Sequence, residues 1–538
     1  MSELRTVELL FLLLLLFIIW FGQIARKADT PYPIVMIIGG LLLGFVPGIP
    51  RIHFDPDLLF LVVLPPLVYS SAWQTSWRDF RYNLVSILLL AFGLVTFTVL
   101  GVALVTPKLF TGFDWRLGLV LGAVVAPTDA IAATAIARRV GLPSRIVDIL
   151  EGESLINDAT GLLALQFAVA LIESGHAPTA LEGTLTLLWL IAGGIAVGVL
   201  IGLLVYYAER RIDDGPIEIA LSVLVPYGAY FAADAIHASG VLAVVASGIF
   251  LTRRSATMFS PAVRIQIWSF WESFTFILNG LVFVLIGLQL RAILSSIRDY
   301  SMSALIRDGA LFSFFLIFLR FLWVFPGAHL AYFIRRRLDR QNEPTPGLRQ
   351  TFIVGWTGMR GGISLAAALA LPLVIENGNP FPQRDLIVFL TFCVILVTLV
   401  LQGLTLAPLV RALGLEGPTG PDCEENEARR LTIEAAVAHL EKTRQQDSGG
   451  LQEVYSDILG HYRKRLATLE LELENKDQEP ELAANQRRYI ELTREATLIE
   501  RETAVRLRNE GHINDQVLRR IERELDLTES KYAKTLDL

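Results

Sequence analysis

Cysteine is scarce in this chain: Cys393 and Cys423 are the two among 538 residues. Two cysteines cannot build a disulfide framework or a four-cysteine metal site. The sequence also lacks the Gly-x-x-x-x-Gly-Lys-Ser/Thr motif that cradles nucleotide phosphates, so chemistry driven by ATP is not expected. We predict no cofactor and no nucleic-acid partner.

Charged residues are few as well, at 19%, whereas 53% of the residues are hydrophobic and the mean hydropathy is positive. Apolar runs of about 20 residues, long enough to cross a bilayer, recur along the chain. The composition therefore predicts an all-α, multi-pass protein embedded in a lipid bilayer. The apolar runs stop near residue 415, so we expect a membrane domain over 1–415 and a helical cytoplasmic tail over 416–538.

Hydropathy predicts thirteen membrane spans. They lie near residues 7–24, 32–47, 56–72, 83–106, 115–137, 146–172, 184–207, 217–237, 240–252, 268–290, 304–333, 350–374 and 386–411. The loops on one side carry roughly twice as many Arg and Lys residues as those on the other, and the richer side is expected to face the cytosol. The N-terminus is therefore predicted outside the cell, and the tail inside.

Two of the predicted spans are interrupted. The fifth contains Pro127, which cannot continue a helix, followed by Asp129, and the twelfth contains four glycines around Arg360. Interruptions at matching positions of two halves indicate inverted repeats with a transport site where the broken helices cross. Asp129 would then lie at the positive end of one half-helix, and Arg360 would neutralise carbonyl ends of the other. The alternative is that the glycines only allow close helix packing.

The sixth span carries the most costly charge. A charged side chain at the bilayer centre costs about 2.5 to 3.5 kcal/mol on insertion scales. Glu153 and Asn157 share one helical face, while Asp158 shares another with Ser154. Oxygens of Asp158, Ser154 and Thr128 would suit a monovalent cation. Burial disfavours the charged form of a carboxylate whereas a bound cation favours it, so H⁺ and Na⁺ or Li⁺ should compete for Asp158.

Arg320 is the second costly charge, since it lies in the apolar run 314–323 of the eleventh span. An unpaired buried ion is strongly destabilising, so Arg320 must have a partner within the membrane domain. We predict a structural ion pair with Glu153.

These motifs resemble those of the monovalent cation:proton antiporters, specifically the electroneutral branch of NhaP-type proteins and the sodium/proton exchangers of animals. The resemblance covers residues 5–415. It rests on residues 64–67 (LPPL), 126–129 (APTD), 151–158 (EGESLIND), Arg320 and residues 358–362 (GMRGG).

The resemblance implies a thirteen-span fold with a six-helix core, a dimerisation domain and elevator-like alternating access. It also implies that Asp158 binds the ion with support from Asn157, that Thr128, Asp129 and Ser154 complete the site, and that Glu153 and Arg320 form a bridge. Electrogenic relatives have a second Asp where this chain has Asn157, so exchange of one proton per cation is expected. Some archaeal members have a glutamate where this chain has Ser70, which leaves the full ion-coordinating network and the choice of ion open.

The expected function is therefore antiport of Na⁺ or Li⁺ against H⁺ across the inner cell membrane, in pH homeostasis, by a homodimer that is not an enzyme. A K⁺/H⁺ antiporter is the alternative on the same scaffold. An intramembrane aspartyl protease needs Gly-x-Gly-Asp and a metalloprotease needs His-Glu-x-x-His, and the sequence has neither. A channel would instead give cation currents at constant pH.

The tail shows helical periodicity near 425–445, 451–466, 482–509 and 513–535, with Gly449, Gly450, Pro480 and Gly511 as separators. It is predicted either to self-associate or bind a regulatory partner, or to be a solvated helical tail without a ligand.

Overall fold

The computed structural model divides the chain into two compact units, Met1–Thr419 and Gly420–Leu538. It describes residues 3–47, 56–174, 179–212, 214–297, 300–339, 346–375, 378–415, 420–446, 452–474, 480–510, 512, 514, 516–522 and 524–526. The boundary predicted after residue 415 borders a segment, 416–419, that is outside the described residues.

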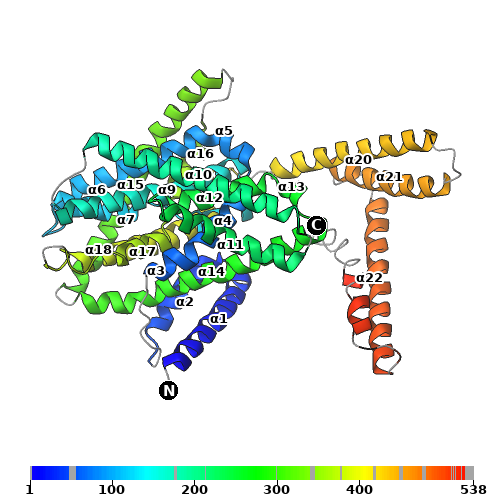
Figure 1. Ribbon diagram of the computed structural model, residues 1–538, viewed down its shortest axis with the longest axis horizontal. Helices are drawn as coiled ribbons and strands as arrows, with labels where there is room; N and C mark the ends of the chain where they lie inside the picture. Colours follow the sequence, from blue (N-terminus) through cyan, green and yellow to red (C-terminus); the bar gives the residue numbers. More distant parts are fainter. Residues whose placement is uncertain are drawn as a thin grey trace. The chain divides into compact units, whose positions relative to one another are not determined.

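The first unit is a bundle of helices, several of them interrupted or bent (Figure 1). In chain order they are α1 (Glu3–Lys27), α2 (Tyr32–Gly44), α3 (Pro56–Leu58), α4 (Leu64–Gln74), α5 (Trp77–Leu88), α6 (Val95–Leu109), α7 (Trp115–Val125), α8 (Ala130–Arg139), α9 (Ser144–Ser174), α10 (Ala180–Glu209), α11 (Gly215–Asp234), α12 (Gly240–Thr252), α13 (Ser255–Met258), α14 (Pro261–Ser296), α15 (Met302–Asp339), α16 (Leu348–Trp356), α17 (Gly362–Leu369), α18 (Arg384–Val397) and α19 (Gly403–Ala412), with π-helical turns η1 (Leu59–Val63), η2 (Leu89–Leu94) and η3 (Thr398–Gln402).

The prediction of an all-α fold is confirmed: in the described part of the chain, regular structure is helical apart from one β-bridge between Val374 and Pro380. Each apolar segment predicted as a span falls on one of these helices or on consecutive ones. Among the described residues, eight helices are long and apolar enough to cross a membrane, and α2, η1–α4 and α12 are shorter apolar helices. The number of thirteen crossings and the inverted repeats stay predictions.

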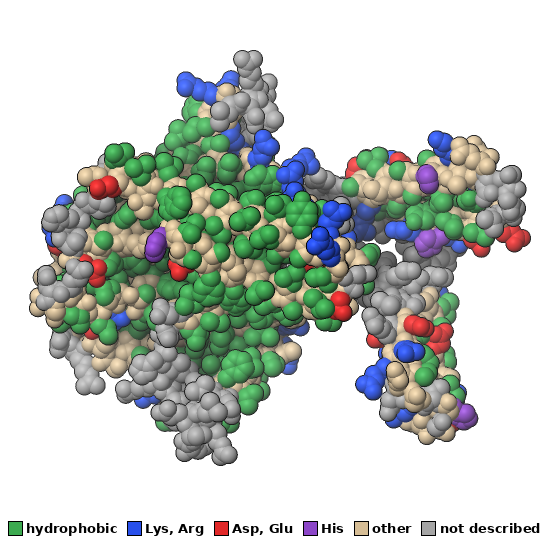
Figure 2. Space-filling model, viewed as in Figure 1, with side chains coloured by type: hydrophobic (Ala, Val, Ile, Leu, Met, Phe, Trp, Pro, Cys, Tyr) green, Lys and Arg blue, Asp and Glu red, His purple; other side chains and the backbone are tan. Residues whose placement is uncertain are grey.

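The outer surface of the first unit is apolar over much of the face seen in Figure 2. Helix α10 is the clearest case, because only 22% of its most apolar 18-residue stretch is buried. More than half of the residue surface is exposed at Leu185, Leu188, Leu200 and Leu204. A helix that is apolar all round and exposes such side chains belongs in lipid or at an interface rather than in water.

Two helices are broken, and the two breaks meet. The fifth predicted span divides into α7 and α8 around residues 126–129, and the twelfth into α16 and α17 around residues 357–361. The backbone N–H of Asp129 donates a hydrogen bond to the carbonyl of Met359, at 2.8 Å. Irregular backbone at membrane depth is tolerated where it is buried in protein or lines a cavity. This contact holds the two irregular segments against each other.

The π-helical turn η2, between α5 and α6, binds two neighbouring helices through its backbone carbonyls. Such turns leave carbonyl groups available outside the helix. At η2, the carbonyl of Leu89 accepts a hydrogen bond from the indole N–H of Trp323, at 3.1 Å, and the carbonyl of Ala91 accepts one from the hydroxyl of Thr160, at 2.8 Å. These bonds fix the α5–α6 helix to α15 and α9.

The second unit is helical, as predicted for the tail. Its described helices are α20 (Gly420–Gln446), α21 (Gln452–Glu474) and α22 (Pro480–Asn509), followed by short helical stretches within 516–526. Helices α20 and α21 pack side by side, and Arg463 of α21 pairs with Glu441 of α20 at 2.5 Å (Figure 1). Pro480 begins α22, while the other predicted separators, Gly449, Gly450 and Gly511, are outside the described residues.

Candidate functional site

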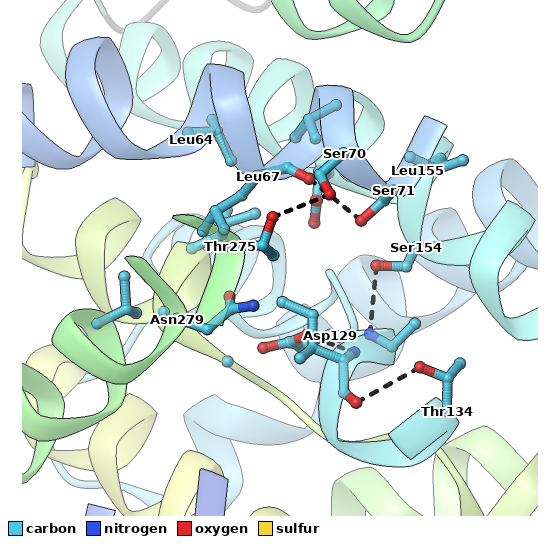
Figure 3. Close-up of a pocket in the computed structure, with 18 of the residues that line it drawn as sticks. Leu64, Leu67, Ser70, Ser71, Asp129, Thr134, Ser154, Leu155, Thr275 and Asn279 are labelled. Carbon is cyan, nitrogen blue, oxygen red and sulfur yellow. Dashed lines mark hydrogen bonds between the residues drawn. The ribbon is translucent and has the colours of Figure 1, made fainter. Parts of the chain in front are cut away.

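A pocket of about 270 Å³ lies beside the crossing of the broken helices. Side chains of α4, α8, α9, α14 and α17 line it (Figure 3). Asp129 and Asp158 supply its carboxylates near the crossing, with the hydroxyls of Ser154 and Ser364 among the lining groups. The pocket extends along α8 from Asp129 at its start to Arg138 in its last turn.

Asp129 caps the N-terminus of α8. Its backbone is extended, and its carboxylate accepts a hydrogen bond from the N–H of Ile131 at 2.8 Å. The hydroxyl of Ser154 accepts one from the N–H of Ala130 at 3.3 Å (Figure 3). The first turn of a helix carries free N–H groups and a partial positive charge. Asp129 and Ser154 therefore satisfy this end of α8, as the sequence predicted for the position of Asp129.

Asp158 faces the pocket from α9 and is 6% exposed. No described residue donates a hydrogen bond to its carboxylate. The carboxylate of Asp129 is close enough to repel it. A buried carboxylate without a donor needs either a proton or a cation.

The ligands available for a cation beside Asp158 are mostly neutral oxygens. Among the described residues, no group of three or more His, Cys, Asp or Glu side chains could hold a metal ion. Ser154 precedes Asp158 by one turn on the same face of α9, and both line the pocket together with Thr128. The Asp158 carboxylate beside the Ser154 hydroxyl offers the oxygen ligands that suit a small, hard cation.

Asn157 and Glu153 lie on the other face of α9, as their spacing predicted, and do not line the pocket. The Asn157 amide donates a hydrogen bond to the Thr128 hydroxyl at 2.7 Å, and that hydroxyl donates to Glu153 at 3.0 Å. The Thr128 hydroxyl thus takes part in two hydrogen bonds, one donated and one accepted. Asn157 acts by holding the segment before α8 in place.

Glu153 and Arg320 form a buried, two-pronged ion pair. The distances are 2.6 Å from Nη1 to Oε1 and 2.9 Å from Nη2 to Oε2, and each side chain is 1% exposed. Arg320 also donates hydrogen bonds to the carbonyl of Val354 in α16, at 3.3 and 3.1 Å. Two parallel, charge-assisted hydrogen bonds between an arginine and a carboxylate are among the strongest hydrogen bonds in proteins. The structure therefore brings together the two residues that the sequence paired, and they tie α9 to α15 and α16.

Arg360 lies at the break of the other helix and is 2% exposed. Its Nε donates a hydrogen bond to the carbonyl of Val125, the last residue of α7, at 3.1 Å, and its Nη1 contacts the carbonyl of Gly358. Its backbone N–H donates to the hydroxyl of Thr398, which belongs to η3. A cation at the negative end of α7 is favourable. The role predicted for Arg360, neutralising carbonyl ends, matches this position.

Several polar groups of the pocket were not anticipated from the sequence. On the wall formed by α4 and α14, the Thr275 hydroxyl donates to the Ser70 hydroxyl at 2.9 Å (Figure 3). The Asn279 amide donates to the Tyr32 hydroxyl at 3.5 Å. An amide within the apolar run of α14 was the signal that could have drawn attention to Asn279. Asp234, His237 and Glu272, the ionisable residues near the end of α11 and in α14, are exposed.

Gly361 must be glycine for Asp129 to keep its place. A Cβ at position 361 would overlap the Asp129 carboxylate. We expect Gly361→Ala to displace Asp129, to slow the antiport expected from the sequence by about tenfold or more because misplacing a group at the site is costly, and to destabilise the protein by about 1–3 kcal/mol. Ion-driven proton transport in proteoliposomes and thermal unfolding would measure both effects. Gly228→Ala is the matched control, since a Cβ there meets nothing within 4 Å, and equal behaviour of the two variants would contradict the assignment.

Comparison with known proteins supports the resemblance seen in the sequence. The sequence model of the family described as "Sodium/hydrogen exchanger, transmembrane" matches residues 11–412. An uncharacterized Na⁺/H⁺ exchanger of Mycobacterium tuberculosis is 34% identical over 507 residues, which cover 92% of this chain and 91% of that protein. A sodium, potassium, lithium and rubidium/H⁺ antiporter of Bacillus pumilus is 32% identical over 456 residues, which cover 82% of this chain and 66% of that protein.

The fold is also similar to a solved structure. The sodium proton antiporter MjNhaP1 from Methanocaldococcus jannaschii matches with a TM-score of 0.59, over 78% of this chain and 100% of that chain. The sequence identity is 19%, so this likeness concerns the fold alone.

Proposed function

Since this chain belongs to the sodium/hydrogen exchanger family, a family of transmembrane antiporters, we propose that it exchanges Na⁺ or Li⁺ for H⁺ across the cell membrane. One observation carries the proposal: Asp158 is a buried carboxylate that faces the pocket without a hydrogen-bond donor from the described residues. H⁺ and the cation neutralise the same group, so they compete for it. Exchange follows if Asp158 crosses between the two sides only when it is loaded.

Movement of the site as a unit is the mechanism that the hydrogen bonds support. Those of Asp129, Thr128, Glu153 and Arg320 stay among α8, α9, α15 and α16, while Ser70 and Thr275 bond to each other on the opposite wall. Because the bonds lie within each wall, we propose that α8, α9, α15 and the broken helices slide past α4 and α14 as an elevator. Each position would open the pocket to one side.

The choice of ion is tested by measuring exchange directly. Purified protein in liposomes that contain a pH-sensitive dye should show proton release after addition of Na⁺ or Li⁺. K⁺/H⁺ antiport is the second candidate, because the Bacillus pumilus relative is named for sodium, potassium, lithium and rubidium. A response to K⁺ alone would favour this candidate, and inertness to all three ions would overturn both.

We expect exchange without net charge movement. Asp158 provides one titrating carboxylate, Asn157 provides none, and the Asp129 carboxylate is held by the N–H of Ile131 at the start of α8, so we propose that one proton leaves for each monovalent cation bound. Currents recorded from proteoliposomes on a solid-supported membrane should therefore remain at the background level during turnover. A steady current whose sign follows the ion gradient would mean more than one proton per ion.

We place the protein in the inner cell membrane with its N-terminus outside, the tail over 416–538 in the cytosol, and a role in pH homeostasis. The exposed apolar side chains of α10 leave room for a homodimer within the bilayer. Protease accessibility of the tail in inside-out vesicles tests the orientation, since a tail protected there would contradict it.

A further inference from the structure

An ion pair lies at one end of the pocket, and the proposed exchange at Asp158 makes no use of it. Arg138, in the last turn of α8, and Glu151, in the second turn of α9, are 2.6 Å apart between Nη2 and Oε1. Both side chains line the same pocket as Asp129 and Asp158. Arg138 is 55% exposed and Glu151 is 14% exposed, so this end of the pocket is where solvent meets it.

One face of α9 connects this ion pair to the site. Glu151, Ser154 and Asp158 are spaced three and four residues apart, which places them on one side of the helix, and all three line the pocket. The rise of 1.5 Å per residue separates Glu151 from Asp158 by about 10 Å along the helix. Ser71 and Gln74 of α4 also line the pocket. Side chains with oxygen atoms therefore line the pocket between its exposed end and Asp158.

A second carboxylate lies near the ion pair of Arg138 and Glu151. Asp148, one turn before Glu151, lies close enough to Asp79, Glu151 and Arg138 for their charges to interact. Glu151 and Asp148 thus both lie close to Arg138, and this local excess of negative charge is attractive to cations. A cation that binds the Glu151 carboxylate must compete with the Arg138 guanidinium, which is already bound to it.

We propose that Glu151 is an outer binding site for the transported monovalent cation and that Arg138 is the latch that closes it. The cation displaces Arg138 from Glu151, is held there, and then moves along Ser154 to Asp158. Arg138 can leave readily, because more than half of its side chain already contacts solvent and an exposed ion pair contributes little to stability. This inference rests on the proposed antiport.

Variants of the full-length protein in proteoliposomes test the latch. Initial rates of Na⁺-driven proton transport give the KM for Na⁺ and the maximal rate. We expect Glu151→Gln to raise KM by about threefold and Arg138→Gln to lower it by about threefold, the range that an exposed ion pair supports, with maximal rates within about twofold of the unmodified protein. Arg307→Gln, which removes an exposed pair with Asp308 outside the pocket, is the control and should change neither quantity.

The double variant distinguishes a latch from a general attraction of cations. If Arg138 acts through Glu151, the double variant should have the KM of Glu151→Gln alone. If the two charges act independently, their effects should cancel and KM should return to that of the unmodified protein, which would overturn the latch. Unchanged KM in both single variants, or lower maximal rates at unchanged KM, would overturn it as well. Absence of exchange by the unmodified protein would instead contradict the proposed function.

Discussion

Replacing Asp158 by asparagine is expected to abolish cation-driven proton transport while leaving the protein folded. Asparagine keeps the shape of the side chain but neither titrates nor neutralises a cation. The change also removes the repulsion between Asp158 and Asp129, and no described residue loses a hydrogen bond to the carboxylate. Stability should therefore be equal or higher. Dye-based transport in proteoliposomes, together with size-exclusion chromatography and thermal unfolding, would record both outcomes.

The control for this variant is Asp234→Asn. Asp234 is exposed at the end of α11 and does not line the pocket, so its replacement should leave transport and folding unchanged. Transport retained by Asp158→Asn would refute the assignment of the site. Loss of transport in both variants would point to a cause other than the site.

Replacing Glu153 by glutamine should have the largest effect on folding. The change leaves Arg320, which is 1% exposed, without its counter-charge, and removing one partner of a buried ion pair costs about 3–5 kcal/mol. The amide of Glu153→Gln keeps one acceptor oxygen for the Thr128 hydroxyl, but it presents an NH2 group to the Nη2 donor of Arg320 where the second carboxylate oxygen was. We expect little monodisperse protein and a markedly lower thermal unfolding temperature.

A second variant separates charge from shape. In Glu153→Gln combined with Arg320→Gln, no uncompensated charge remains, so much of the folded protein should be recovered. If Glu153→Gln alone is as stable as the unmodified protein but inactive, Glu153 takes part in transport rather than in holding α9 to α15. Equal instability of the single and double variants would mean that charge is not what the pair contributes.

The broken helices and the buried charges were predictable because a proline within a helix and an ion within an apolar run each cost free energy, whatever the rest of the fold. Pro127 cannot continue a helix, so it predicts a break at its own position. Arg320 cannot remain unpaired in an apolar run, so it predicts a buried ion pair. Glu153 was predicted as the partner because an unpaired buried ion is costly and Arg320 needs a carboxylate within the membrane domain. The distances in the structure, 2.6 and 2.9 Å, are those of such a pair.

The opposite wall of the pocket was not predictable in the same way. Thr275 and Asn279 are neutral, and a neutral polar residue within a span can bond to its own helix or to a neighbour at little cost. Their position across from Asp129 depends on how α14 packs against α4, which no local pattern contains. The use of the Thr128 hydroxyl by Asn157 and Glu153 likewise follows from the crossing of helices, not from spacing along α9.

Competition between H⁺ and the cation for Asp158 is the central claim, and proton release on ion binding tests it most directly. Calorimetric titration of the purified protein with Na⁺, or with Li⁺ or K⁺ if that is the ion transported, in buffers of different protonation enthalpy gives the number of protons released per ion. We expect one proton per ion for the unmodified protein and neither binding heat nor proton release for Asp158→Asn. Ion binding without proton release, or the same release from Asp158→Asn, would contradict the account.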